Sequence, residues 1–190
     1  MSHLAAILLA AGQSKRMGSS KQLLLLSGKP FIRHCLDNLL EAGLQDIIVV
    51  LGPTGREIEP VISDLPVSIA WNPALKSDMA DSVRIGLGAL PKHVAGVLVC
   101  LGDHPLVKAA TIKEIITYCD THPDKIIIPV FNGKKGHPTL FPRAVIEEIF
   151  TVSTLRDIIH RETERIALLD IFDPGVTVDI DTPEDFQRIA

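Results

Sequence analysis

Short runs of apolar residues alternate along the chain with segments whose apolar positions recur every three or four residues. The runs are rich in β-branched residues, which favours buried strands over helices. We expect strands at residues 4–9, 46–51, 67–71, 94–101, 125–130 and 176–180, with weaker candidates at 138–141 and 166–171. Buried strands that alternate with helices predict βαβ units around a mainly parallel sheet.

The segments between these runs have helical periodicity. We expect helices at residues 30–42, 79–90, 111–119, 143–150, 153–161 and 183–189. In the first of them Phe31, Cys35 and Leu39 share one face. The last begins after Thr182, a typical N-cap residue, with Pro183 in its first position. The whole pattern predicts an α/β fold, a Rossmann-like three-layer α/β/α sandwich that occupies residues 1–190 as a single domain.

Composition narrows the range of functions. The chain has 190 residues, 46% of them hydrophobic, and a net charge of only −4 with scattered basic residues, which argues against nucleic acid as a partner. No apolar stretch approaches the roughly 20 residues that span a bilayer, so we expect no membrane contact and a cytoplasmic location. Cys35, Cys100 and Cys119 are far apart and lie in apolar segments, as buried free thiols do.

A loop rich in small residues, LAAGQSKRMGSSK, follows the first expected strand. In open α/β sheets ligands bind there, beyond the carboxyl ends of the strands. Ala10, Ala11 and Gly12 let the backbone come close to a ligand, and successive amides can accept phosphate oxygens. Arg16 and Lys21 add positive charge. Neither GxGxxG nor a Walker A pattern fits, and an ordinary glycine-containing turn with solvated basic residues is the alternative explanation.

Two acidic positions follow other expected strands. Asp103 comes directly after the apolar run that ends at Leu101, and Gly102 permits close approach there. Magnesium is bound through one or two carboxylates together with substrate phosphates, so Asp103 is a candidate ligand. The run VDID offers Asp181 as a second ligand, and on an alternating strand Asp179 faces the same way. Turn formation or helix capping explains Asp181 equally well.

Five motifs stand in the order that is typical of the molybdenum cofactor nucleotidyltransferase family: LAAGQSKRMGSSK, NPALKSDMADSVR, GDHP, GHP and VDIDTPEDF. The chain most resembles the cytidylyltransferase branch, which carries LAAG, with Ala11 here, where the guanylyltransferase branch carries LAGG. GHP in a late loop is also typical of that branch. The resemblance implies a nucleotidyltransferase fold of the glycosyltransferase-A-like type. The chain departs from the family at Asp78-Met79, where Gly-Met is usual.

The resemblance implies a role for each motif. The nucleotide would contact Ala10, Ala11, Gly12, Gln13, Ser14, Arg16, Lys21, Asn72, Met79 and Ser82. The catalytic residues would be Arg16, Lys21 and Asp103, with Mg²⁺ held by Asp103 and Asp181. The pterin-side substrate would lie beside Gly136, His137 and Pro138. A lone loop histidine is more often a surface residue, so substrate contact at His137 is only one of two open explanations.

The implied reaction transfers CMP from CTP to the terminal phosphate of molybdopterin and releases pyrophosphate, and a molybdoenzyme client would receive the product. A phosphate nucleophile is already ionised, so neither a covalent enzyme intermediate nor a strong general base is needed. Three alternatives stay open: a sugar or polyol phosphate as acceptor, GTP as donor for a guanylyltransferase, and a non-catalytic carrier of the molybdenum cofactor. A carrier has no need for Asp103 and Asp181, so these residues favour an enzyme.

Overall fold

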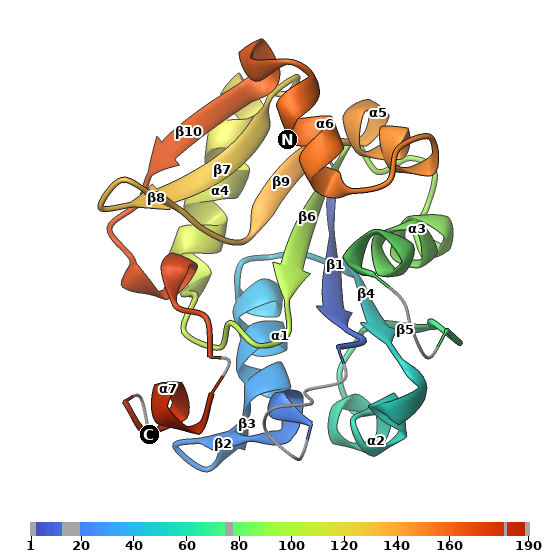
Figure 1. Cartoon of the computed structure of the whole chain (residues 1–190), viewed down its shortest axis with the longest axis vertical. Coiled ribbons are helices and arrows are strands. Elements are labelled where there is room, and N and C mark those ends of the chain that lie inside the picture. Colours follow the sequence, from blue (N-terminus) through green and yellow to red (C-terminus); the bar gives the residue numbers. More distant parts are fainter. Residues whose placement is uncertain (1–2, 13–19, 75–77, 181, 189–190) are drawn as a thin grey trace.

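The computed structural model describes residues 3–12, 20–74, 78–180 and 182–188. Its main sheet has eight strands in the order β10-β7-β9-β6-β1-β4-β5, with β8 paired to β7 (Figure 1). The bounds are β1 Leu4–Ala10, β4 Asp46–Leu51, β5 Ser68–Trp71, β6 Gly96–Leu101, β7 Ile126–Phe131, β8 Lys134–Lys135, β9 Thr139–Pro142 and β10 Ile166–Asp170. β1 pairs in parallel with β4 and β6, whereas β9 runs antiparallel between β6 and β7. The mainly parallel sheet is confirmed.

Helices cover both faces of this sheet. The α-helices are α1 Phe31–Glu41, α2 Glu59–Ile62, α3 Met79–Ala89, α4 Ala109–Thr121, α5 Arg143–Ile146, α6 Leu155–Arg161 and α7 Pro183–Gln187. Shorter elements are the 3₁₀ turns η1 Lys21–Leu23, η2 Pro53–Glu57, η3 Glu147–Phe150, η4 Thr163–Arg165 and η5 Pro174–Thr177, and the hairpin of β2 Leu25–Leu26 and β3 Lys29–Pro30. Residues of α1, α2 and α4 pack against one face, and residues of α3, α5 and α6 against the other.

The central strand β1 shows why a strand of this sheet is apolar at every position of its sequence. Ala6 and Leu8 belong to the core that includes α1 and α4, whereas Ala5 and Ile7 belong to the core that includes α3. Successive side chains on a strand point to opposite faces, so a strand covered on both faces must be apolar at every position. This arrangement gives the three layers expected from the sequence.

Side-chain capping sets the starts of α3, α6 and α7. The Asp78 carboxylate accepts a hydrogen bond from Asp81 N at 2.8 Å and so caps α3. Thr182 caps α7 in the same way, with Asp185 as its partner, which confirms the predicted N-cap. Across the described ranges, every helix falls short of the combined length and apolar character that a membrane span requires.

Two expectations about secondary structure were wrong. The expected strand at 176–180 is instead the end of η5 followed by irregular chain. The carboxylate of Asp173 accepts a hydrogen bond from Gly175 N at 3.0 Å, which turns the chain at Pro174 before it can join the sheet. Val176 and Ile180 are fully buried, so their apolar character reflects packing alone. The expected helix at 143–150 divides into α5 and the 3₁₀ turn η3.

Candidate active site

The loops that follow β1 and β6 lie side by side at the carboxyl edge of the sheet. Gly102 N donates a hydrogen bond to Leu9 O at 2.9 Å. A Cβ atom on Gly102 would lie 3.1 Å from the same oxygen, tighter than ordinary contacts, so glycine keeps the two loops close. This contact brings the loop of Ala11 and Gly12 next to Asp103, as their positions after parallel strands predict.

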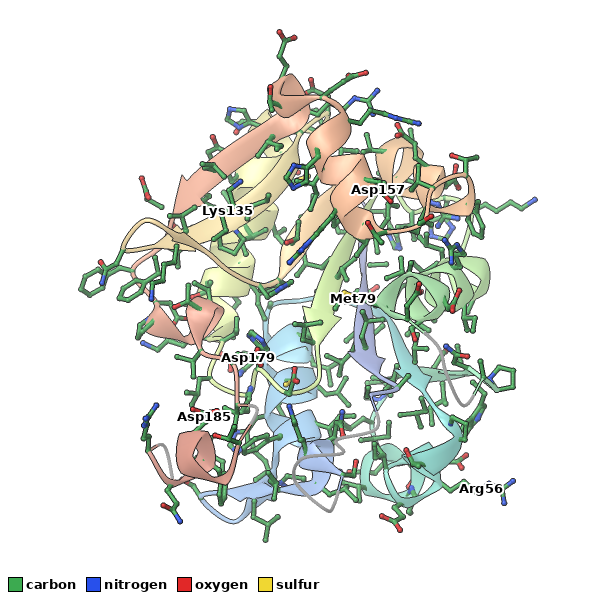
Figure 2. All side chains as sticks on the ribbon, in the orientation of Figure 1. Arg56, Met79, Lys135, Asp157, Asp179 and Asp185 are labelled. Atoms are coloured by element: carbon green, nitrogen blue, oxygen red, sulfur yellow. The ribbon has the colours of Figure 1, made fainter. Side chains whose placement is uncertain are left out.

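A cavity of about 310 Å³ opens at this edge. It is lined by Leu9, Ala11, Gly12, Gln22, Asp78, Met79, Ser82, Leu101, Asp103 and Asp179. Figure 2 shows Met79 at the first turn of α3 and Asp179 on the chain that leads from η5 to α7. The volume lies within the range of sites for small molecules. Five residues predicted from the sequence to bind nucleotide or metal therefore meet at one cavity: Ala11, Gly12, Met79, Ser82 and Asp103.

Lys21 places a positive charge beside this cavity. Its Nζ atom lies 3.7 Å from Asp103 Oδ2, and the two side chains are 10% and 25% exposed. Charges that are partly removed from water interact more strongly than surface charges do. The 3₁₀ turn η1 thus fixes a cation against the acidic residue at the end of β6.

Asp103, His104 and Asp179 form a cluster with the donor groups of a metal site. One ligand atom from each residue lies within 4.8 Å of the others, and His104 Nε2 is 3.9 Å from Asp179 Oδ1. Two carboxylates suit a hard divalent cation, and imidazole adds a nitrogen donor that transition metals accept. The predicted ligand Asp181 lies outside the described residues, and so do three predicted nucleotide contacts, Gln13, Ser14 and Arg16.

Asn72 joins the end of β5 to the first turns of α3. Its Nδ2 atom donates to Ser82 Oγ at 3.1 Å, and its Oδ1 atom accepts from Ala74 N at 3.1 Å. Asn72 is 1% exposed and lines a separate, more open hollow with Trp71 rather than the 310 Å³ cavity. The side chain of Ala10 also lies in the core and does not line that cavity. Their contact with nucleotide stays a prediction.

The GHP loop is held against the segment that precedes Asp179. His137 N donates to Val176 O at 2.8 Å, and a Cβ atom on Gly136 would lie only 2.2 Å from that oxygen. The His137 ring packs edge-on against His104, with centroids 5.4 Å apart. Burial, with a smaller contribution from His104, lowers the pKa of His137 to about 4. The GHP and GDHP motifs therefore meet through two histidine rings, and His137 is largely buried rather than a surface residue.

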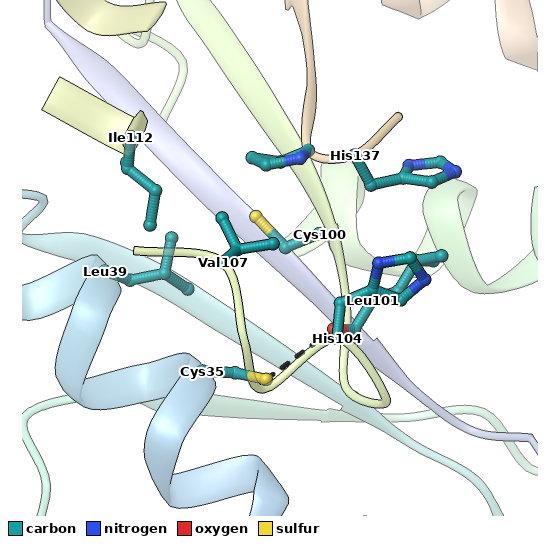
Figure 3. Close-up of a pocket in the computed structure, with 9 residues that line it drawn as sticks. Cys35, Leu39, Cys100, Leu101, His104, Val107, Ile112 and His137 are labelled. Atoms are coloured by element: carbon teal, nitrogen blue, oxygen red, sulfur yellow. Dashed lines mark hydrogen bonds between the residues drawn. The ribbon is translucent and has the colours of Figure 1, made fainter. Parts of the chain in front are cut away.

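A small apolar pocket of about 20 Å³ lies beneath these rings (Figure 3). It is lined by Cys35, Leu39, Cys100, Leu101, His104, Val107, Ile112, His137 and Pro138. All three cysteines of the chain are buried free thiols, as predicted. Burial raises the pKa of the Cys35 thiol to about 12, which keeps this group protonated and inert at neutral pH.

Asp173 supports the site, although nothing in the sequence distinguished it from other aspartates. It is 2% exposed, and its carboxylate accepts hydrogen bonds from Lys108 N at 3.0 Å, Thr111 Oγ1 at 2.6 Å and Gly175 N at 3.0 Å. These bonds join the start of α4 to η5 and thereby position the chain that carries Asp179.

Gln22 is a second site residue that the sequence analysis missed. It lines the cavity directly after Lys21.

Residues 6–166 match the MobA-like NTP transferase domain. The bifunctional protein GlmU of Mycobacterium avium (strain 104) is 37% identical over 121 residues, which are 59% of this chain and 24% of GlmU. The match thus spans about a quarter of that relative. GlmU of Mycobacterium ulcerans (strain Agy99) is 36% identical over 126 residues, 62% of this chain and 25% of GlmU.

Solved structures agree in fold over nearly the whole chain. Rv0371c of Mycobacterium tuberculosis H37Rv superposes with a TM-score of 0.83 and 26% identity, covering 99% of this chain and 97% of Rv0371c. A structure of Rv0371c in complex with manganese gives 0.79 and 24%, with the same coverage. A nucleotidyl transferase from Methanothermobacter thermautotroptrophicus (Mth528) gives 0.85 and 22%, covering 100% and 96% of the two chains. Because the family match covers most of its length, this chain belongs to the MobA-like NTP transferase domain family, a family of nucleotidyltransferases.

Proposed function

We propose that this protein transfers a nucleoside monophosphate from a nucleoside triphosphate to a phosphorylated small molecule. The observation that carries the proposal is the convergence of Lys21, Asp103 and Asp179 on one cavity edge beyond β1 and β6. Such a reaction requires two anionic reactants to be held together while charge at the α-phosphorus is neutralised. Cationic, acidic and backbone amide groups at one sheet edge meet that requirement.

In the proposed step an oxygen of the acceptor phosphate forms a bond to the α-phosphorus. The bond from that phosphorus to the bridging oxygen breaks, and pyrophosphate leaves with the electron pair. The Lys21 ammonium stabilises phosphate charge in the ground and transition states alike, and the amides of Ala11 and Gly12 orient the triphosphate. Arg16 would add a second cation. The acceptor phosphate is already ionised, so no side chain has to remove a proton.

A divalent cation suits the donor groups of this edge. Asp103 and Asp179 offer carboxylate oxygens within reach of each other, and Asp181 is proposed as a further ligand two residues along the chain. We assign Mg²⁺ to the site, and the manganese complex of Rv0371c supports a divalent ion in such a fold. When bound, the ion neutralises phosphate charge.

The specific substrates that we assign are CTP and molybdopterin, and the product is the cytosine dinucleotide form of the cofactor. Ala11 in the LAAG motif lines the cavity and supports the smaller base. His137 and Pro138 border the neighbouring pocket, and the His137 ring contacts His104 of the Asp103 cluster, which supports a role for them in contact with the acceptor. The product would pass to a molybdoenzyme client.

A second candidate keeps the reaction and replaces the acceptor with a sugar or polyol phosphate. In the proposed step Lys21 acts on the nucleotide phosphates and Asp103 holds the metal ion, so both residues serve either acceptor equally well. The pocket beside His137, about 20 Å³, has room for about one water molecule, so it does not distinguish the two classes of acceptor. The GHP loop supports the pterin acceptor.

The test is an assay of pyrophosphate release. Purified protein receives each nucleoside triphosphate in turn, with Mg²⁺ or Mn²⁺, and with molybdopterin or a panel of sugar and polyol phosphates. We expect pyrophosphate release only when CTP and molybdopterin are supplied together. Release only with a sugar or polyol phosphate establishes the second candidate, and faster release with GTP establishes a guanylyltransferase. A carrier would be established if wild type binds the cofactor but releases no more pyrophosphate than Asp103→Asn does.

A further inference from the structure

A second set of metal-binding groups lies at the amino edge of the sheet, opposite the candidate active site. His3 directly precedes β1, Asp46 begins β4, and His93 lies three residues before β6. The register places Ala5 beside Asp46, and Ala95 N donates to His3 O at 2.8 Å. The starts of three adjacent parallel strands therefore gather residues that are far apart in sequence. In Figure 1 this edge is at the tail of the β1 arrow, and the candidate active site is at its head. The seven residues of β1 separate the two edges by roughly 20 Å.

The three side chains are already close to the geometry that a metal needs. His3 Nε2 lies 2.5 Å from Asp46 Oδ2, and the rings of His3 and His93 have centroids 4.5 Å apart. One ligand atom from each of the three residues lies within 4.8 Å of the others. Ligand atoms around a tetrahedral zinc ion are separated by about 3.3 Å, so small side-chain rotations are sufficient.

Exposure leaves room for an ion to enter. The side chains of His3 and Asp46 are 41% and 30% exposed, and His93 is exposed as well. Water can therefore complete the coordination shell, and the exposed rings can turn without disturbing the core.

We propose that His3, Asp46 and His93 form a binding site for a divalent transition metal, with Zn²⁺ as the best fit. Two imidazole nitrogens and one carboxylate are a zinc donor set, whereas Mg²⁺ prefers oxygen ligands alone. This set has two imidazoles and one carboxylate, whereas the cluster beside the cavity has one imidazole and two carboxylates, so a transition metal is favoured more strongly here. An ion bound here connects β1, β4 and β6 in the native state only, so it raises the unfolding temperature.

The experiment measures Zn²⁺ affinity by calorimetry and the visible absorption of Co²⁺ as a spectroscopic probe. The proteins are wild type, His3→Asn, His93→Asn, the exposed-histidine control His160→Asn, and Asp103→Asn, which disables the cluster at the opposite edge. Circular dichroism and unfolding temperature in EDTA verify that each variant folds. Pyrophosphate release by His93→Asn is also measured with Mg²⁺. An unchanged rate separates this site from the proposed catalytic reaction.

We expect a Zn²⁺ site of similar affinity in wild type, Asp103→Asn and His160→Asn, and tetrahedral Co²⁺ absorption in all three. His3→Asn and His93→Asn should bind Zn²⁺ at least about tenfold more weakly and lose the rise in unfolding temperature. Undiminished affinity in a folded His3→Asn/His93→Asn protein would overturn the proposal. So would the loss of all Zn²⁺ binding in Asp103→Asn, or the absence of binding in wild type.

Discussion

Protonation of His137 should destabilise the protein below neutral pH. In the unfolded chain a histidine binds a proton as the pH falls through about 6.5, whereas burial lowers the pKa of His137 in the folded protein to about 4. Between these values the unfolded state binds more protons, so the free energy of unfolding decreases as the pH falls. The contribution is fully present above about pH 6.5 and is lost by about pH 4.

The size of this effect follows from the two pKa values. One unit of pKa corresponds to about 1.4 kcal/mol, so the gap from about 6.5 to about 4 amounts to about 3 kcal/mol over the whole window. Between pH 7 and pH 4.5 we expect a loss of about 2 kcal/mol through this residue. That loss is large beside the total stability of about 5–15 kcal/mol that is usual for a domain.

Urea unfolding at several pH values from 7 to 4.5 measures this loss in wild type and in His137→Gln. Glutamine keeps a polar side chain of similar size but cannot take up a proton in this range. Wild type should lose about 2 kcal/mol more than His137→Gln, while His160→Gln, which removes an exposed histidine, should follow wild type. Parallel stability curves for wild type and His137→Gln would refute the reasoning, because they would mean that His137 protonates as easily in the folded protein as in the unfolded chain.

Four further changes test the proposed site. Lys21→Ala should lower kcat/KM by about 10² to 10³ by removing phosphate stabilisation, and kinetics equal to wild type would return this residue to a structural role. Asp103→Asn should lower kcat at least about 100-fold with an unchanged circular dichroism spectrum, and near-normal turnover would remove it from the metal site. Ala11→Gly should erode a preference for CTP over GTP by no more than about 1 to 3 kcal/mol in competition assays, and a wild-type preference for GTP would reject the cytidylyl assignment. Gly136→Ala should cost at least about 1 kcal/mol in urea unfolding, because its Cβ would lie 2.2 Å from Val176 O, and unchanged stability would show that the GHP loop moves freely.

The sheet could be predicted from the sequence where burial alone decides the pattern. β1 and β6 are covered on both faces, so each is a continuous apolar run. The same rule failed at 176–180, where Val176 and Ile180 are equally apolar and buried. There the hydrogen bonds of Asp173 decide the backbone, and they depend on Lys108 and Thr111, more than 60 residues away. A run of apolar residues indicates that a segment is buried. It identifies a strand only where no tertiary contact turns the chain.

The candidate site was predictable to the extent that it follows strand ends. Lys21 and Asp103 come after β1 and β6, and parallel strands that pair must bring their following loops together. The packing of His137 on His104 had no comparable signal, because it depends on how a late antiparallel strand is threaded between β6 and β7. The membership of Asp179 in the cluster likewise depends on the turn at η5.

The direction of β9 determines at which edge of the sheet the loop before it lies. Thr139 lies opposite Val99 and Pro142 opposite Gly96, so β9 begins at the carboxyl edge of β6 and runs away from it. The loop before β9 therefore projects at the edge that holds the candidate active site, while both its ends are anchored by strands of the sheet. Residues 132–137 include β8, which pairs with β7, and His137, whose backbone N–H donates to Val176 O, so any replacement of this loop has to keep both contacts. A redesign of acceptor choice by a loop graft would therefore also act on the segment that carries Asp179, whereas the pairing of β1 with β6 does not involve this loop.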